Sequence, residues 1–301
     1  MFEAIDSGRV TKEPTTTTTS NDAPRATADD ATRPTATDAR GSAPRRVLSI
    51  ARNAFREAVR DRVLYNLVVF VLLLTAGAIF LGELSAAQEA KIIVDMGLSA
   101  MLIFGVFIAI FVGVGLVYKE IERRTVYAIF AKPVGRGEFL VGKYLGLCAT
   151  LATNVAIMAA GVALALVYVH GGYDPLVARI CPAVALVFFE LTIIVAVALL
   201  FSSFSTPALS ALLTFAVFII GHFSADMRLL AAANGTTAAR LLFSALYYLL
   251  PNLSHYAYIT AASHGTMPTA PDFFAAALYA LLYDAALLTA AALIFNRRNF
   301  K

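Results

Sequence analysis

Residues 137–144, with the sequence GEFLVGKY, nearly match a phosphate-binding loop. In nucleotide-binding ATPases the pattern G-x-x-x-x-G-K-[S/T] surrounds phosphates with backbone N–H groups, and its final hydroxyl binds magnesium. Gly137, Gly142 and Lys143 fit the pattern, but Tyr144 replaces the Ser or Thr. A phosphate loop also follows a buried strand, whereas AKPVGR precedes this segment and a long apolar stretch follows it. We therefore interpret the match as chance, and expect Gly142 to allow close packing and Lys143 to reach lipid head groups.

The composition indicates a membrane protein. Of the 301 residues, 59% are apolar and only 15% are charged, with a mean hydropathy of +0.74. A soluble domain has about a quarter of its residues charged. The apolar residues form long blocks, each long enough or nearly so to cross a hydrocarbon core as a helix, the shortest with little tilt. We predict an all-α fold with six transmembrane helices, at 63–82, 97–117, 144–169, 180–201, 207–222 and 275–295.

The basic residues predict the orientation. One group lies before the first span, between the second and third, and after the sixth: Arg45, Arg46, Arg52, Arg56, Arg60, Arg62, Lys119, Arg123, Arg124, Lys132, Arg136, Lys143, Arg297, Arg298 and Lys301. The opposite loops hold only Lys91, Arg179, Arg228 and Arg240. The positive-inside rule then predicts a multi-pass protein of the inner (plasma) membrane with both termini in the cytoplasm. No basic patch carries interleaved aromatic residues, so nucleic acid is not an expected partner.

The chain divides into a polar tail and a membrane domain. Residues 1–44 contain TTTTTS and repeated Ala, Asp, Pro and Thr, which predicts a disordered cytoplasmic tail. Residues 45–301 form the predicted six-helix domain. At its start, residues 46–61 (RVLSIARNAFREAVRD) have an amphipathic helical pattern. Such a helix is expected either in the membrane interface or packed under the helix bundle.

The segment 118–143, between the second and third spans, is rich in charge. It reads YKEIERRTVYAIFAKPVGRGEFLVGK. The second helix should continue past the membrane through Glu120, Glu122 and Arg123. It cannot run unbroken through Pro133, so a short new helix should start near Gly137 and lead into the third span. We expect a bent, charged hairpin on the cytoplasmic side.

The segment 223–274 is the longest on the outer side. Within it, AARLLFSALYYLL is apolar but shorter than the roughly 20 residues that a spanning helix needs. Pro251-Asn252 should end this helix. We expect a re-entrant or surface-lying segment.

Two acidic residues and an amide lie within predicted spans: Glu190 in the fourth, Asp284 in the sixth and Asn154 in the third. A charge at the bilayer centre costs about 3 kcal/mol. Glu190 and Asp284 could line a substrate or proton path. Alternatively, each is protonated or hydrogen-bonded to a neighbour such as Asn154 or Asn66 and holds helices together. We favour the second interpretation.

No catalytic, cofactor-binding or metal site is predicted. The four histidines, His170, His222, His255 and His264, are scattered over the outer side without the paired spacing of metal ligands. Cys148 and Cys181 are expected to be core residues too far apart to form a disulfide.

Several stretches together resemble the permeases of ABC-2 type transporters. VYKEIERRTVYAIFAKPVGRGEFLVGKYLG is similar to their cytoplasmic loop, and LLFSSFSTPALSALLTFAVFIIGH, LYYLLPNLSHY and the terminal LIFNRRNFK agree in the same order. The resemblance covers about residues 46–301, and it is strongest to the subgroup linked with multi-copper enzyme maturation.

The resemblance implies a permease subunit, often of an exporter, that has no ATPase site of its own. Two copies, or two different permeases, would form the pathway above separate ABC-class ATPase subunits. The loop between the second and third spans would then contact the ATPase, with candidate residues Glu120, Glu122, Arg123, Arg124, Thr125, Lys132, Pro133 and Arg136. The substrate is not implied. An ion-coupled secondary transporter using Glu190 and Asp284, and a non-transporting assembly scaffold, remain alternatives.

Overall fold

The computed structural model describes residues 43–60, 69–70, 73, 77, 88–122, 136–172, 175–224, 229 and 237–297. Within these ranges the regular secondary structure is helical, with no strand. Most of the predicted first span lies outside the described residues. Nearly all of the predicted tail does too, except that Ala43 and Pro44 already belong to the first helix.

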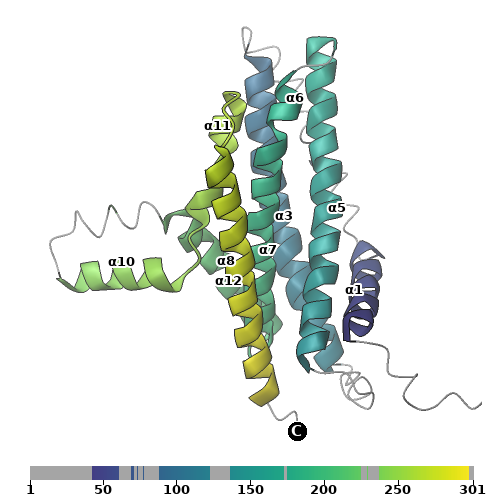
Figure 1. Cartoon of the computed structure of the whole chain (residues 1–301), viewed down its shortest axis with the longest axis vertical. Coiled ribbons are helices and arrows are strands. Elements are labelled where there is room, and N and C mark those ends of the chain that lie inside the picture. The colour runs from purple at the N-terminus through teal and green to yellow at the C-terminus, as the bar shows by residue number, and fades with distance from the viewer. Residues whose placement is uncertain are drawn as a thin grey trace, which may run out of the picture. The chain divides into compact units, whose positions relative to one another are not determined.

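Figure 1 shows the described helices, labelled in chain order. They are α1 (Ala43–Arg60), α3 (Glu89–Glu122), α5 (Arg136–His170), α6 (Pro175–Arg179), α7 (Cys181–Ser202), α8 (Pro207–His222), α10 (Thr237–Leu249), the 3-10 helix η2 (Leu253–Tyr256), α11 (Ile259–Ser263) and α12 (Ala270–Arg297). Proline marks the first turn of both α7 and α8, where its missing N–H has no helical partner to lose.

Four helical segments are long and apolar enough to cross a membrane: Glu89–Gly115, Gly137–Val169, Pro175–Ser202 and Ala270–Ile294. These correspond to the second, third, fourth and sixth predicted spans. The fifth is α8, an apolar helix of 16 residues that is shorter than the other four. The all-helical membrane fold is therefore confirmed for the described residues, while the number of six spans stays a prediction.

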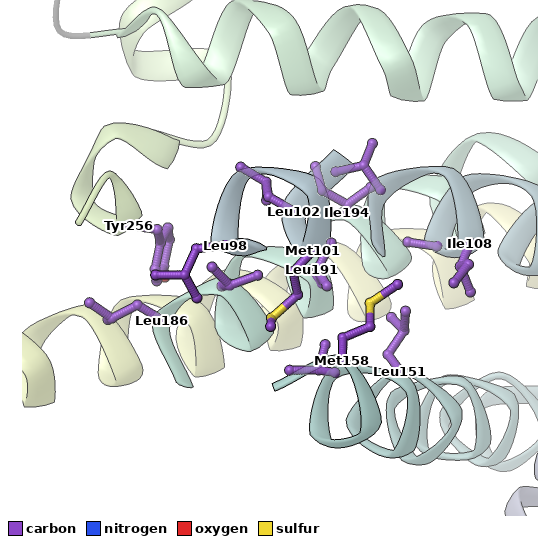
Figure 2. Packing of buried hydrophobic residues seen from close by; sticks show 14 of the residues in the cluster. Leu98, Met101, Leu102, Ile108, Leu151, Met158, Leu186, Leu191, Ile194 and Tyr256 are labelled. Carbon is purple, nitrogen blue, oxygen red and sulfur yellow. The ribbon is translucent and has the colours of Figure 1, made fainter. Parts of the chain in front are cut away.

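Helix α7 is the centre of the packing. It contacts α3, α5, α8 and α12, and 67% of its most apolar stretch is buried, against 17% for α12. Figure 2 shows the apolar side chains that fill this core. The labelled ones are Leu98, Met101, Leu102 and Ile108 of α3, Leu151 and Met158 of α5, Leu186, Leu191 and Ile194 of α7, and Tyr256 of η2. Because lipid tails are as apolar as these side chains, close van der Waals contact rather than burial from water must hold the helices together.

Helix α1 packs in parallel along the first turns of α5. Arg46 contacts Glu138 and, one turn later in both helices, Ile50 contacts Gly142; Ala54 then contacts Gly146. Each of these pairs is separated by 92 residues in the sequence. The apolar side of α1 therefore lies against α5, while its position relative to the membrane stays a prediction.

Two glycines make this close approach possible. A Cβ atom on Gly142 would lie 2.7 Å from Ile50 Cβ, and one on Gly146 would lie 2.5 Å from the carbonyl oxygen of Ala51. Residues 137–144 lie entirely within α5 and form no loop. The phosphate-loop match is therefore a chance one, and close packing is the role of Gly142.

The expected position of Lys143 was wrong. Its side chain is 1% exposed, and its Nζ lies 3.6 Å from Oε2 of Glu57 and 5.8 Å from the centre of the Phe139 ring. Helix α1 covers this face of α5, so the ammonium group cannot reach lipid head groups, and Glu57 supplies the opposite charge within the protein.

Replacement of Gly146 by alanine should weaken the contact between α1 and α5. The added methyl group would force the two backbones apart, at a cost of about 1–3 kcal/mol. The apparent free energy of unfolding in detergent, measured by denaturant titration, should fall accordingly. Gly137→Ala is the control, since its Cβ would meet no atom within 4 Å. An equal loss in both variants would contradict this account.

Candidate functional site

The predicted contact segment is attached to two neighbouring helices. Helix α3 continues through Glu120 to Glu122, as expected, and α5 begins at Arg136, one residue before the predicted start. The two helices pack side by side in opposite directions, which brings the end of α3 and the start of α5 to the same end of the bundle. No separate short helix precedes the third span, because α5 is continuous to His170. The other candidates, Arg123, Arg124, Thr125, Lys132 and Pro133, lie outside the described residues.

Helix α1 holds the first turn of α5 by a charged pair. Nε and Nη2 of Arg46 donate hydrogen bonds to the two carboxylate oxygens of Glu138, at 3.0 and 2.8 Å. This hydrogen bonding raises the pKa of the Arg46 guanidinium. The geometry is the bidentate one in which arginine binds carboxylates most strongly. No motif in the sequence relates these two residues, so sequence analysis did not identify the pair.

Asp284 joins α12 to α5. The hydroxyl group of Tyr144 donates a hydrogen bond of 2.6 Å to Oδ2 of Asp284, and Thr192 of α7 interacts with the same carboxyl group. Asp284 is 5% exposed, and its Oδ1 has no hydrogen-bond partner within the described part of the chain. Tyr144, the residue that breaks the phosphate-loop pattern, is thus a donor to a buried acid.

Glu190 joins α7 to α8. Its Oε1 lies 3.4 Å from Nδ1 of His222, and its side chain is 1% exposed. Asn154, expected as a neighbour of the buried acids, instead donates from Nδ2 to the carbonyl oxygen of Thr150 in its own helix. Asn66 lies outside the described residues. Both acids are therefore bonded to neighbouring helices, but through a histidine and a tyrosine.

Asn252 organises the segment between α10 and α12. Its Oδ1 accepts hydrogen bonds from the hydroxyl groups of Ser224 and Ser254. Its backbone N–H donates to the hydroxyl oxygen of Tyr279 on α12, at 2.9 Å. The helix before it, α10, ends at Leu249 just ahead of Pro251, as predicted. The sequence signal for this role was the polar Asn after the proline of LYYLLPNLSHY.

The adjoining η2 helix is anchored in the same way. The hydroxyl group of Tyr256 donates to the carbonyl oxygen of Ala276 on α12, at 2.9 Å. Burial raises the pKa of this tyrosine, so it remains a neutral donor. The segment from Asn252 to Tyr256 is consequently tied to α12 by both backbone and side-chain groups.

The remaining His, Cys, Asp and Glu side chains of the described ranges are scattered. Among the residues that the structure describes, no group of three His, Cys, Asp or Glu side chains could hold a metal ion. Cys148 and Cys181 are both free thiols. The expectation that both are core residues was wrong for Cys181, which is exposed because it begins α7 at the edge of the bundle.

Two comparisons with known proteins bear on the function. The chain matches the family described as "ABC-2 family transporter protein" over residues 48–300. It is also 28% identical, over 124 residues, to a protein of Pseudomonas aeruginosa named "Probable ABC transporter permease protein NosY". That alignment covers 39% of this chain and 45% of the relative, so the chain spans less than half the length of the curated relative it matches.

The bond between Tyr144 and Asp284 should show energetic coupling in a double-mutant cycle. Tyr144→Phe and Asp284→Ala should together cost less than the sum of the single changes, by about 0.5–2 kcal/mol. The apparent free energy of unfolding in detergent is the measurement. A matched cycle with Tyr168→Phe, on the same helix but 87% exposed, should give no coupling. Strictly additive effects for Tyr144 would rule out a stabilising hydrogen bond.

Proposed function

Because the chain belongs to the ABC-2 transporter family, we propose that it is a permease subunit that exports an unidentified substrate with energy from a separate ABC-class ATPase subunit. The family match and the named relative support a transporter membrane subunit. In the family this role leaves ATP hydrolysis to another chain, so this protein is not itself an enzyme. The ATPase, the direction of transport and the substrate belong to the proposal.

The observation that carries the proposal is the length and pairing of α3 and α5. They contain 34 and 35 residues, or about 50 Å each at 1.5 Å per residue. A hydrocarbon core is about 30 Å thick, so both helices extend beyond it. The described part of α3 ends at Glu122 and α5 begins at Arg136. A charged segment attached to two long helices suits a coupling element.

The proposed mechanism is a rigid-body movement. Closure of the ATPase would push on residues 118–143, and α3 and α5 would carry the displacement to α7, against which both pack. The pair of Arg46 and Glu138 would make α1 move with α5. Small displacements at one end of packed helices can rotate a whole bundle, and this rotation would open a path toward the outer side.

The proposal includes the assembly and its orientation. The permease would work as a homodimer or with a second permease, in the inner membrane with both termini in the cytoplasm. Helix α12 exposes Phe274, Leu278, Leu281 and Leu282, an apolar face suited to lipid. Residues 223–274 would form a re-entrant segment on the outer side, which the bond between Asn252 and Tyr279 supports.

An ion-coupled secondary transporter is a second candidate. It is favoured by one observation, the buried Oδ1 of Asp284 that lacks a hydrogen-bond partner among the described residues. A buried carboxyl oxygen of this kind could take up a proton or cation. A scaffold that moves no substrate would require neither the carboxyl groups nor ATP.

Reversal of charge at the paired helix ends should abolish coupling. We expect Arg136→Glu combined with Glu120→Arg to lower stimulation of the partner ATPase at least about tenfold, because misplaced charges at a contact cost several kcal/mol. ATPase assays on the reconstituted complex give the result, and the amount of protein in the membrane fraction controls for insertion. Arg179→Glu, at the opposite end of the bundle, is the matched control. If the double variant stimulated the partner ATPase as strongly as the parent protein, residues 118–143 would have no coupling role.

Neutral replacement of the buried acids separates the two transport mechanisms. Glu190→Gln and Asp284→Asn keep hydrogen-bonding capacity but cannot bind a proton reversibly. If ATP drives transport, ATPase-linked transport in proteoliposomes should stay within about twofold of the parent protein. Transport that collapses in these variants, or that follows an imposed proton gradient without ATP, would establish the ion-coupled alternative instead.

A further inference from the structure

Helix α1 has an arginine stripe on the side that faces away from α5. Its contact residues, Val47, Ile50, Ala51 and Ala54, lie on one side of the helix. The exposed residues Arg45, Ser49, Arg52 and Arg56 follow one another at intervals of four and three residues, so they form one line on the opposite side. Arg46 lies between these two sides and is bound to Glu138.

The three arginines of the stripe, Arg45, Arg52 and Arg56, are available for a partner outside the described structure. Arg45, Arg52 and Arg56 are exposed, and none forms an ion pair with any residue that the structure describes. Leu48, beside the stripe, is 69% exposed. A surface that combines arginines with a large exposed apolar side chain is suited to a membrane interface, where charged head groups adjoin acyl chains.

The place of α1 in the fold favours lipid over a soluble protein. Figure 1 shows α1 at the edge of the bundle, beside the start of α5, and α5 is the helix against which it chiefly packs. Next to the glycines that contact α1, α5 exposes Val141 and Leu145, which continue into its exposed apolar side. A partner bound beneath the bundle would meet the ends of α3 and α5, whereas the arginine stripe points sideways, away from α5.

We propose that the arginine stripe of α1 binds the phosphate groups of anionic phospholipids at the membrane surface. The guanidinium group presents paired N–H donors that match two phosphate oxygens. Arg45, Arg52 and Arg56 hold the lipid head groups, and Leu48 contacts the upper part of their acyl chains. Because α1 is fixed to the first turns of α5, these lipids tether the start of α5 to the bilayer. The proposal does not depend on which substrate or ATPase the permease uses.

The absence of tryptophan from the sequence permits a direct test. Leu48→Trp places one fluorescent reporter beside the stripe in the full-length protein. Reconstituted in phosphatidylcholine that carries a nitroxide on its head group, the reporter should be quenched. Unlabelled phosphatidylglycerol should relieve this quenching more effectively than unlabelled phosphatidylcholine, and the ratio of the two gives a relative binding constant. Arg52→Gln combined with Arg56→Gln should lower that ratio at least about fivefold. A change of about fivefold is what the loss of a single arginine near an anionic surface produces, so it is the minimum expected from the loss of two.

Two controls make the result specific. Arg179→Gln with Arg240→Gln removes the same charge at exposed positions elsewhere and should leave the ratio unchanged. A reporter at Tyr168→Trp, on the exposed far end of α5, should show no preference that depends on the stripe. Thermal unfolding of each variant verifies that α1 remains folded.

Three outcomes would overturn the proposal. The parent reporter could show no preference between the two lipids, or a preference that the glutamine variants retain, and the stripe would then be merely solvated. Free inorganic phosphate could remove the preference at millimolar concentration, which would indicate a soluble anion as the ligand. Finally, the reporter could be insensitive to the labelled lipid and become shielded only when an ATPase subunit is added, which would identify a protein contact.

Discussion

A peptide group inside a hydrocarbon layer has no water to bond with, and this constraint shapes the whole described structure. Long helices satisfy it internally, but it leaves little to hold one helix against another, because lipid and apolar side chains are alike. The contacts that remain effective are close backbone approach and hydrogen bonds between side chains. The bundle uses both: glycines where α1 meets α5, and buried acids where α5, α7, α8 and α12 meet.

The polar contacts are distributed so that neighbouring helices are bonded in pairs. Tyr144 and Asp284 join α5 to α12, Glu190 and His222 join α7 to α8, and Asn252 joins the segment after α10 to α12. Each donor or acceptor would be costly to leave without a partner in a medium of low polarity. These bonds therefore fix the rotation of each helix about its axis, which apolar packing alone specifies poorly. A bundle held in this way can rotate as a unit, which the proposed transport mechanism requires.

Local features of the fold could be read from the sequence, and distant pairings could not. Hydropathy located α3, α5, α7, α8 and α12, and Pro251 indicated where α10 must stop. Residues that contact one another across the bundle were not identified as partners, or were given the wrong position. Asp284 is 140 positions from Tyr144, and nothing near either residue indicates the other. Lys143 was expected at the lipid surface, because only the packing of α1 shows that this face of α5 is covered. Cys181 was expected in the core, because its exposure depends on where α7 begins at the bundle edge.

The parallel register of α1 and α5 has a consequence for biosynthesis. The two partners are separated by 92 residues, and a ribosome adds about 5–20 residues per second. For roughly 5 to 20 seconds after a residue of α1 is added to the chain, then, its partner residue on α5 has not yet been made. During that interval the apolar side of α1 lacks the helix that covers it in the folded protein. The nascent chain must therefore keep α1 at the membrane surface or under a chaperone until α5 is inserted, and docking of α1 becomes a late step in assembly.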